Sequence, residues 1–130
     1  MKTINYTGRC HCGKIRFSFK SEEIIDGKQC NCSLCIRRGA IMSSKYIPAK
    51  DFVPHKNLDD MFIYQWNDRV VANLYCKTCG IFPYFGNDEW GYRVNLGCIE
   101  QLDALALKIQ ILDGRSMPIA DNPGPHPGNS

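Results

Sequence analysis

Long apolar runs are missing from this sequence of 130 residues. No apolar stretch approaches the roughly 20 residues that a membrane-spanning helix needs. Residues 1–6 contain neither an apolar core nor a small-residue cleavage site typical of a secretory signal. We therefore expect a chain without a membrane segment, located in the cytoplasm, which is a reducing compartment.

Blocks of like charge are also missing. The chain has 16 Lys and Arg residues against 13 Asp and Glu residues, a net charge of +3, and no run of five or more like charges. Proteins that bind nucleic acids usually gather basic residues in a patch or stripe. We therefore expect neither a nucleic acid nor a membrane surface as a partner.

Helical periodicity is weak throughout the chain. Apolar residues alternate with polar ones over residues 15–20 and 107–111, which predicts half-buried strands. Shorter strand-like runs cover residues 61–64, 70–75 and 92–96, and Asn67-Asp68 suits a hairpin turn. Short helical turns are expected within residues 34–38 and 100–107. The sequence predicts a mainly β fold.

The composition changes near residue 113. Pro118, Pro123, Pro125 and Pro127 follow within a short distance and are interspersed with glycine. Proline fixes φ and lacks a backbone donor, so this segment is expected to be extended or disordered. The length suits one domain. We predict a single domain over residues 1–115 and a tail over residues 116–130.

Cysteine is abundant, and its spacing is informative. Seven of the eight cysteines form three clusters: Cys10 and Cys12; Cys30, Cys32 and Cys35; Cys76 and Cys79. In a reducing compartment such clusters favour metal binding. The alternative is a scaffold held together by disulfide bonds. The first and last clusters each end in glycine, which tolerates the positive φ of a metal-binding turn. Together they supply the four thiolates of a tetrahedral zinc site.

The middle cluster offers only three thiols. Three protein ligands leave a tetrahedral zinc one ligand short, as in catalytic zinc sites. One alternative is a fourth protein ligand, such as His11, His55 or an acidic residue. Another is a metal shared with one of the other cysteine pairs. Dividing the seven clustered cysteines into one site of four and one site of three uses all of them, and it predicts two zinc ions per chain.

The charge of a three-thiolate site favours a soft substrate. Three thiolates and a divalent zinc carry one net negative charge, so the metal is a weak Lewis acid and suits a thiol ligand. Arg37 and Arg38 come directly after the middle cysteine cluster in the sequence. They would offset its negative charge or pair with a substrate carboxylate. Alternatively, both arginines lie at the surface with their side chains in solvent.

The remaining candidates carry less information. Cys98 is expected to be a small buried apolar residue, with a reactive thiol as the alternative. His11 is expected to point away from the metal, and His55 to be exposed. Asn95 either satisfies backbone groups or faces a ligand.

Four motifs carry a family resemblance: residues 8–13 (GRCHCG), 30–39 (CNCSLCIRRG), 76–81 (CKTCGI) and 94–99 (VNLGCI). In this order they resemble the glutathione-dependent formaldehyde-activating enzyme family, also called centromere-protein-V-like, over residues 3–115. The resemblance implies an Mss4-like fold of small packed antiparallel sheets pinned by zinc. It implies a structural zinc on Cys10, Cys12, Cys76 and Cys79, and a catalytic zinc on Cys30, Cys32 and Cys35.

The resemblance also implies a reaction, which is carbon–sulfur lyase chemistry joining formaldehyde to glutathione as S-hydroxymethylglutathione. The expected partner is therefore a small glutathione-like thiol, with Arg37, Arg38 or Arg93 binding its carboxylates. The alternative is a non-catalytic zinc-stapled binding module in which protein atoms fill every zinc position. The sequence carries no indication of how many chains assemble.

Overall fold

A computed structural model of the chain describes residues 2–65 and 72–116. The predicted tail, apart from Ser116, and the turn at Asn67-Asp68 lie outside these ranges. None of the helices in the described ranges is both long and apolar enough to cross a membrane.

Within the described residues, ten strands form three small sheets. In the first sheet the order is β1 (Thr3–Arg9), β2 (Arg16–Glu22) and β5 (Phe52–Val53). In the second it is β10 (Lys108–Leu112), β3 (Asp26–Cys30) and β4 (Met42–Ser43). In the third it is β6 (Met61–Tyr64), β7 (Ala72–Cys76), β8 (Tyr84–Asn87) and β9 (Gly91–Val94).

In residues 2–65 and 72–116, helical structure is limited to short pieces. The one α-helix in the described ranges is α1 (Ser33–Arg38). The 3-10 turns are η1 (Ala49–Asp51), η2 (Leu58–Asp60), η3 (Leu96–Cys98), η4 (Ala104–Ala106) and η5 (Gly114–Ser116). The mainly β prediction is therefore confirmed, and the expected helical turn within residues 100–107 is the single turn η4.

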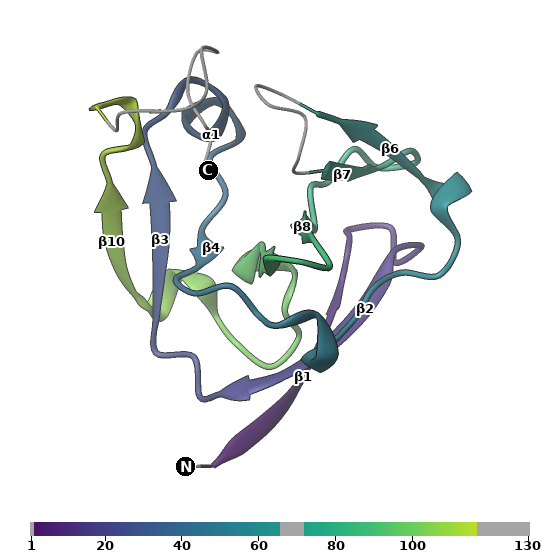
Figure 1. The fold of residues 1–130 in the computed structure, drawn as a ribbon, viewed down its shortest axis with the longest axis horizontal. Helices are drawn as coiled ribbons and strands as arrows, with labels where there is room; N and C mark the ends of the chain where they lie inside the picture. Colours follow the sequence, from purple (N-terminus) through teal and green to yellow (C-terminus); the bar gives the residue numbers. More distant parts are fainter. Residues whose placement is uncertain (1, 66–71, 117–130) are drawn as a thin grey trace.

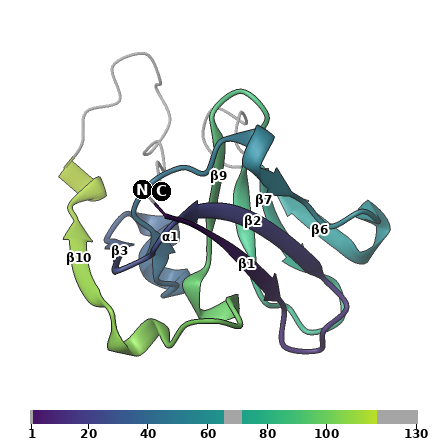
Figure 2. The ribbon, with the colours of Figure 1, turned by 90° about the horizontal axis from the view of Figure 1, so that it is seen from below.

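The sheets lie around a shared interior. Figures 1 and 2 show β10, β3 and α1 on one side of the molecule and β6 and β7 on the other. Most strand pairings are antiparallel, but β3 and β10 pair in parallel. A parallel pair needs a long connection, and here most of the chain runs between the two strands.

Aromatic side chains join the first and third sheets. Phe52 of β5 stacks on Tyr92 of β9 with 4.4 Å between ring centroids, and it meets the edge of Tyr84 at 4.9 Å. Phe17 of β2 also meets Tyr84, at 5.0 Å. A second, smaller core cluster of Met42, Phe82 and Phe85 lies apart from this one. Such aromatic pairs prefer stacked and edge-on arrangements and contribute beyond their buried area.

One close backbone contact positions β9. Ile47 and Tyr92 exchange two backbone hydrogen bonds of 2.7 and 2.8 Å. Gly91 permits this approach, because its φ is +93° and a Cβ there would collide with the carbonyl oxygen of Ile47. Arg93, two residues after Gly91, is thereby brought beside the loop that contains Tyr46.

Two candidate metal centres

The first centre joins two distant loops. Its four thiols belong to Cys10 and Cys12, between β1 and β2, and to Cys76 and Cys79, at the end of β7. All four sulfur atoms lie within 4.8 Å of one another. The Cys10–Cys12 and Cys12–Cys76 sulfur distances are 3.6 and 3.7 Å. A tetrahedral zinc with Zn–S bonds of ~2.3 Å requires an edge of about 3.8 Å, so this group could hold such an ion.

The two loops have the same local design. Gly13 donates its backbone N–H to the carbonyl of Cys10, and Gly80 donates to the carbonyl of Cys76. Both glycines have positive φ, +83° and +78°. The N–H of Ile15 also points at the Cys10 sulfur, 3.3 Å away. Backbone donors aimed at sulfur stabilise thiolates, the form that binds metals.

The prediction that His55 is exposed is wrong. Its side chain is only 12% exposed. Nδ1 accepts a hydrogen bond from the backbone N–H of Arg16 at 3.1 Å, so Nε2 carries the proton and donates to Asp60 Oδ2 at 2.7 Å. The loop after Pro54 folds back onto β2 and buries the ring. Since both ring nitrogens are engaged, His55 is not a free metal ligand, and His11 is exposed outside both cysteine groups.

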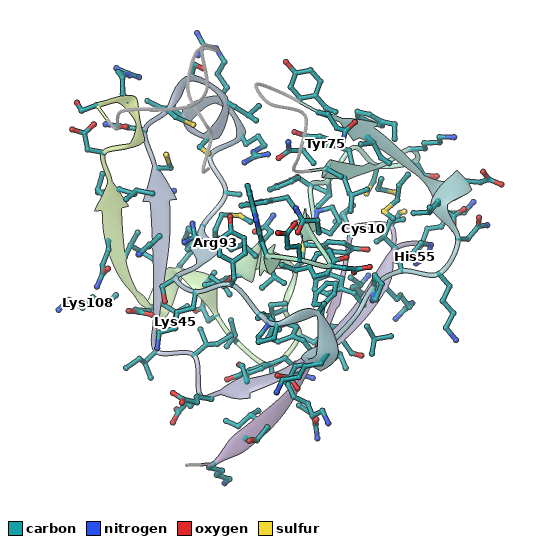
Figure 3. All side chains as sticks on the ribbon, viewed as in Figure 1. Cys10, Lys45, His55, Tyr75, Arg93 and Lys108 are labelled. Carbon is teal, nitrogen blue, oxygen red and sulfur yellow. The ribbon has the colours of Figure 1, made fainter. Side chains whose placement is uncertain are left out.

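The second centre lies where β3 meets α1. Cys30 ends β3, Cys32 is the N-cap of α1, and Cys35 is its buried residue. Their sulfur atoms also lie within 4.8 Å of one another, and no other His, Cys, Asp or Glu of the described ranges joins them. The structure therefore brings the seven clustered cysteines together as four and three. Figure 3 shows a group of sulfur atoms close to the labelled Cys10.

Local hydrogen bonds favour the thiolate form at the second centre. The N–H of Cys35 donates to the Cys32 sulfur at 3.3 Å, so a thiol takes the place of the usual N-cap oxygen. The Cys35 thiol also donates to Cys32. This bond, against the opposing effect of burial, lowers the pKa of Cys32 to about 5. Such a thiol is ionised at neutral pH and ready to bind a soft metal.

Arg38 packs directly against this centre. Its Nη1 donates to Asn73 Oδ1 at 2.7 Å, and its Nη2 lies 3.5 Å from the Cys35 sulfur. The guanidinium sits 3.9 Å above the ring of Phe82. Arg37 instead is exposed and donates to the carbonyl of its own helix residue Ser33 at 2.8 Å. Of the adjacent pair Arg37 and Arg38, only Arg38 is brought to the cysteines.

A small cavity of about 10 Å³ opens beside the second centre. Its lining residues are Lys28, Cys30, Cys35, Arg38, Ala40, Met42, Arg93 and Leu112. Three of these side chains are cationic and none is a carboxylate. The Nε atoms of Arg38 and Arg93 are buried without a hydrogen-bond partner. The structure thus places the predicted Arg93 at this cavity.

The other predicted residues have structural partners. Asn95 donates to the carbonyl of Phe82 at 2.8 Å and accepts from the N–H of Gly97 at 3.0 Å, so its amide satisfies backbone groups. Cys98 is partly buried beside the first centre. Burial, and then the nearby thiolates of Cys10 and Cys79, raise the pKa of Cys98 to about 12. That thiol is therefore protonated at neutral pH.

Sequence reasoning missed Asn31, which lies between two cysteines of the second centre. Its Nδ2 donates to Asp113 Oδ1 at 2.9 Å, and its Oδ1 accepts from the N–H of Arg115 at 2.9 Å. Its own N–H donates to the carbonyl of Leu112. These bonds fasten the cysteine loop to the end of β10. The feature of the sequence that could have indicated this role is the position of Asn31 between two predicted metal ligands.

A larger groove, of about 660 Å³, lies between the β2–β3 connection and residues 43–51. It differs in charge from the small cavity, because Glu22, Glu23, Asp26 and Asp51 face it along with Lys20 and Lys45. Tyr46 lines the groove and also carries the Arg93 guanidinium 4.6 Å above its ring. Arg93, which lines the small cavity, thus contacts Tyr46, which lines the groove. Figure 3 shows Arg93 above Lys45, another residue of the groove.

Comparison with known proteins agrees with this architecture. Residues 5–113 match the family model described as glutathione-dependent formaldehyde-activating enzyme. The crystal structure of a Rhodobacter sphaeroides protein, a structural genomics target, superposes with a TM-score of 0.68 at 25% sequence identity. That match covers 80% of this chain and 99% of the other. The fold is the Mss4-like fold, and the chain belongs to the glutathione-dependent formaldehyde-activating enzyme family.

Proposed function

We propose that this protein is a zinc-dependent carbon–sulfur lyase that makes or breaks the adduct of formaldehyde with a thiol such as glutathione. The observation that carries the proposal is the contrast between the two centres. One has four thiols, and the other has three thiols beside a cavity. The family's name supports the choice of thiol and aldehyde.

The donor sets suit zinc in both centres. Cys10, Cys12, Cys76 and Cys79 would hold a structural ion, because four thiolates complete a tetrahedron. Cys30, Cys32 and Cys35 would hold a second ion with one position free for substrate. A zinc bound there would keep the substrate sulfur as a thiolate by lowering its pKa.

The reaction balances without an oxidant. In the forming direction, the thiol sulfur makes a bond to the carbon of formaldehyde, and the carbonyl electron pair moves to oxygen. The proton released by the thiol ends on that oxygen, which gives S–CH₂–OH. In the reverse direction the carbon–sulfur bond breaks and the same proton returns to sulfur.

The chain's own residues prepare this step. Arg38, fixed by Asn73, places positive charge beside the Cys35 sulfur and offsets the negative charge of three thiolates. Ala40, Met42 and Leu112 give the cavity an apolar wall. A low-dielectric wall excludes water and strengthens each charge interaction at the site.

The proposal is tested by following ¹³C-formaldehyde with glutathione by NMR. The zinc-loaded wild type should accelerate exchange between free formaldehyde and the adduct. Cys35→Ser should remove the acceleration, while Cys98→Ser, outside both cysteine groups, should retain it. Exchange no faster than the uncatalysed rate, in protein with both centres filled, would mean a non-catalytic zinc module.

A further inference from the structure

We infer that Cys32 and Cys35 of the second centre are a redox-active pair, which hydrogen peroxide oxidises to a disulfide with release of any zinc held there. The inference goes beyond the proposed function, because it concerns the thiols themselves and holds whether or not the centre makes a thiol adduct. It gives a second chemistry to a centre that offers a metal only three ligands in the described ranges.

The spacing of Cys32 and Cys35 suits a reversible disulfide. Two residues separate them, which is the C-x-x-C arrangement found in many redox-active proteins. Cys32 is the N-cap of α1, and Cys35 lies one turn further along the chain. Residues three apart in a helical turn have Cα atoms about 5 Å apart, inside the range of roughly 4.4–6.8 Å that disulfides require.

The third thiol, Cys30, is a poorer partner. The three sulfur atoms all lie within 4.8 Å of one another, and the N–H of Cys35 points at the Cys32 sulfur from 3.3 Å. Cys30 ends β3, and the backbone at Cys32 is also extended. Residues two apart in an extended chain have Cα atoms about 6.6 Å apart, near the upper limit for a disulfide. The pair is therefore Cys32 with Cys35, and Cys30 remains a thiol.

A small oxidant can reach this pair. Cys35 is 8% exposed and lines the cavity of about 10 Å³ together with Cys30, whereas Cys32 is fully buried. A cavity of that size admits about one water-sized probe. Hydrogen peroxide has nearly the same width as water, so the cavity favours it over bulkier oxidants, and Cys35 is the member of the pair that meets it.

The oxidation balances in two steps. The Cys35 thiolate, with Arg38 Nη2 3.5 Å from its sulfur, attacks one oxygen of hydrogen peroxide. The O–O bond breaks, which leaves a sulfenic acid on Cys35 and a hydroxide that becomes water. The Cys32 thiolate then attacks the Cys35 sulfur, the S–O bond breaks, and a second water leaves. Two thiols and one peroxide thus give one disulfide and two waters, and thiols such as glutathione reverse the change by exchange.

The first centre provides a comparison within the same chain. Cys76 and Cys79 have the same C-x-x-C spacing, and the N–H of Cys79 lies 3.5 Å from the Cys76 sulfur. Cys12 of that centre is exposed, so access alone would favour its oxidation. Four thiolates complete a tetrahedral zinc, however, and a firmly held ion leaves few of them free to react. The second centre has one ligand fewer and is expected to oxidise first.

The test uses mass spectrometry, because trypsin places the second centre on one peptide. Cleavage after Lys28 and Arg37 releases residues 29–37 (QCNCSLCIR), which contain all three of its cysteines. The zinc-loaded full chain is treated with hydrogen peroxide and free thiols are alkylated. Disulfides are then reduced and labelled with a second reagent. The first label should appear on Cys30 and the second on Cys32 and Cys35, while a chromophoric chelator detects one zinc released per chain.

Variants check the assignment of the pair. Cys30→Ser should still form the disulfide, and Cys35→Ser should lose it. Cys98→Ser removes a thiol outside both cysteine groups and should oxidise at the wild-type rate. Glutathione added after the peroxide should restore three free thiols in residues 29–37.

Three results would overturn the inference. In the first, residues 29–37 keep all three thiols under peroxide. In the second, the disulfide includes Cys30, or forms in Cys35→Ser as readily as in the wild type. In the third, residues 10–14 (CHCGK) of the first centre lose their thiols as fast as residues 29–37, which would mean unselective oxidation. Each of these results would leave the proposed function standing.

Discussion

Arg38 and Asn73, 35 positions apart in the chain, form a hydrogen bond of 2.7 Å that ties α1 to β7. Asn73 is buried, and its Nδ2 donates to the carbonyl of Tyr64 at 3.0 Å, which turns its oxygen toward Arg38. The second centre is therefore braced by the sheet that carries half of the first centre.

This bond gives the first prediction. Asn73→Leu removes the acceptor of Nη1 in the half-buried guanidinium, which should lower the free energy of unfolding by about 1–3 kcal/mol. Loss of such an outer partner should also weaken zinc binding at the second centre about 10-fold or more. Chelator competition measures the affinity. Arg37→Met is the control, because Arg37 contacts its own helix, and equal losses in both variants would contradict the bracing role.

The first centre should carry much of the stability. It connects the loop after β1 to the end of β7, and structural zinc can contribute on the order of 10 kcal/mol to folding. Removing metal with a strong chelator, or replacing Cys76 with Ser, should abolish the cooperative thermal transition. Circular dichroism on heating measures this. An unchanged transition after complete zinc removal would mean that the aromatic core alone holds the sheets.

Substitutions at Gly91 and Gly39 separate the cost of a positive φ from the cost of a steric collision. Both have positive φ, +93° and +69°, but a Cβ on Gly91 meets the Ile47 carbonyl, whereas a Cβ on Gly39 meets nothing within 4 Å. Gly39→Ala should cost about 1 kcal/mol of unfolding free energy from conformation alone. Gly91→Ala should cost about 2 kcal/mol or more, because strain and collision add. Denaturant unfolding compares them, and equal costs would refute the close approach of β9.

Tyr92 gives a prediction for high pH. Burial, and then the hydrogen bond to Asp88, raise the pKa of Tyr92 to about 12 from 10.0. Between these values the folded chain keeps a proton that the unfolded chain has lost, so this contribution is full below pH 10 and fades as pH rises toward 12. Tyr92→Phe should flatten the fall in stability over that range. The test measures the free energy of unfolding between pH 10 and 12 and follows tyrosine ionisation by absorbance. If stability falls with pH as steeply in Tyr92→Phe as in the wild type, Tyr92 is not the group responsible.

Much of the site was predictable because cysteine spacing is local. Residues two or three apart at a tight turn converge on one point whatever the rest of the fold does, so the three clusters themselves were predictable. Their division into four and three was one alternative among several, and the structure decides it by bringing the first and last clusters together. The strand at residues 16–22 was predictable for a similar reason. Its apolar and polar residues alternate because one face of the strand is buried, and this pattern is visible in the local sequence.

Other features depend on distant partners. β3 reads Asp-Gly-Lys-Gln-Cys and has no apolar alternation, because backbone pairing with β4 and β10 holds it. Adjacent arginines at 37 and 38 look equivalent in sequence, and only the phase of α1 and the position of Asn73 decide that Arg38 faces inward. His55 is buried by a loop that folds back onto β2, which its polar surroundings did not indicate.

The most direct test of two metal centres counts zinc per chain in protein purified without chelators. The account predicts two zinc ions in the wild type and one in Cys35→Ser, with the fold and its thermal transition retained in the variant. Zinc content that Cys35→Ser leaves unchanged, or a wild type without zinc, would contradict it.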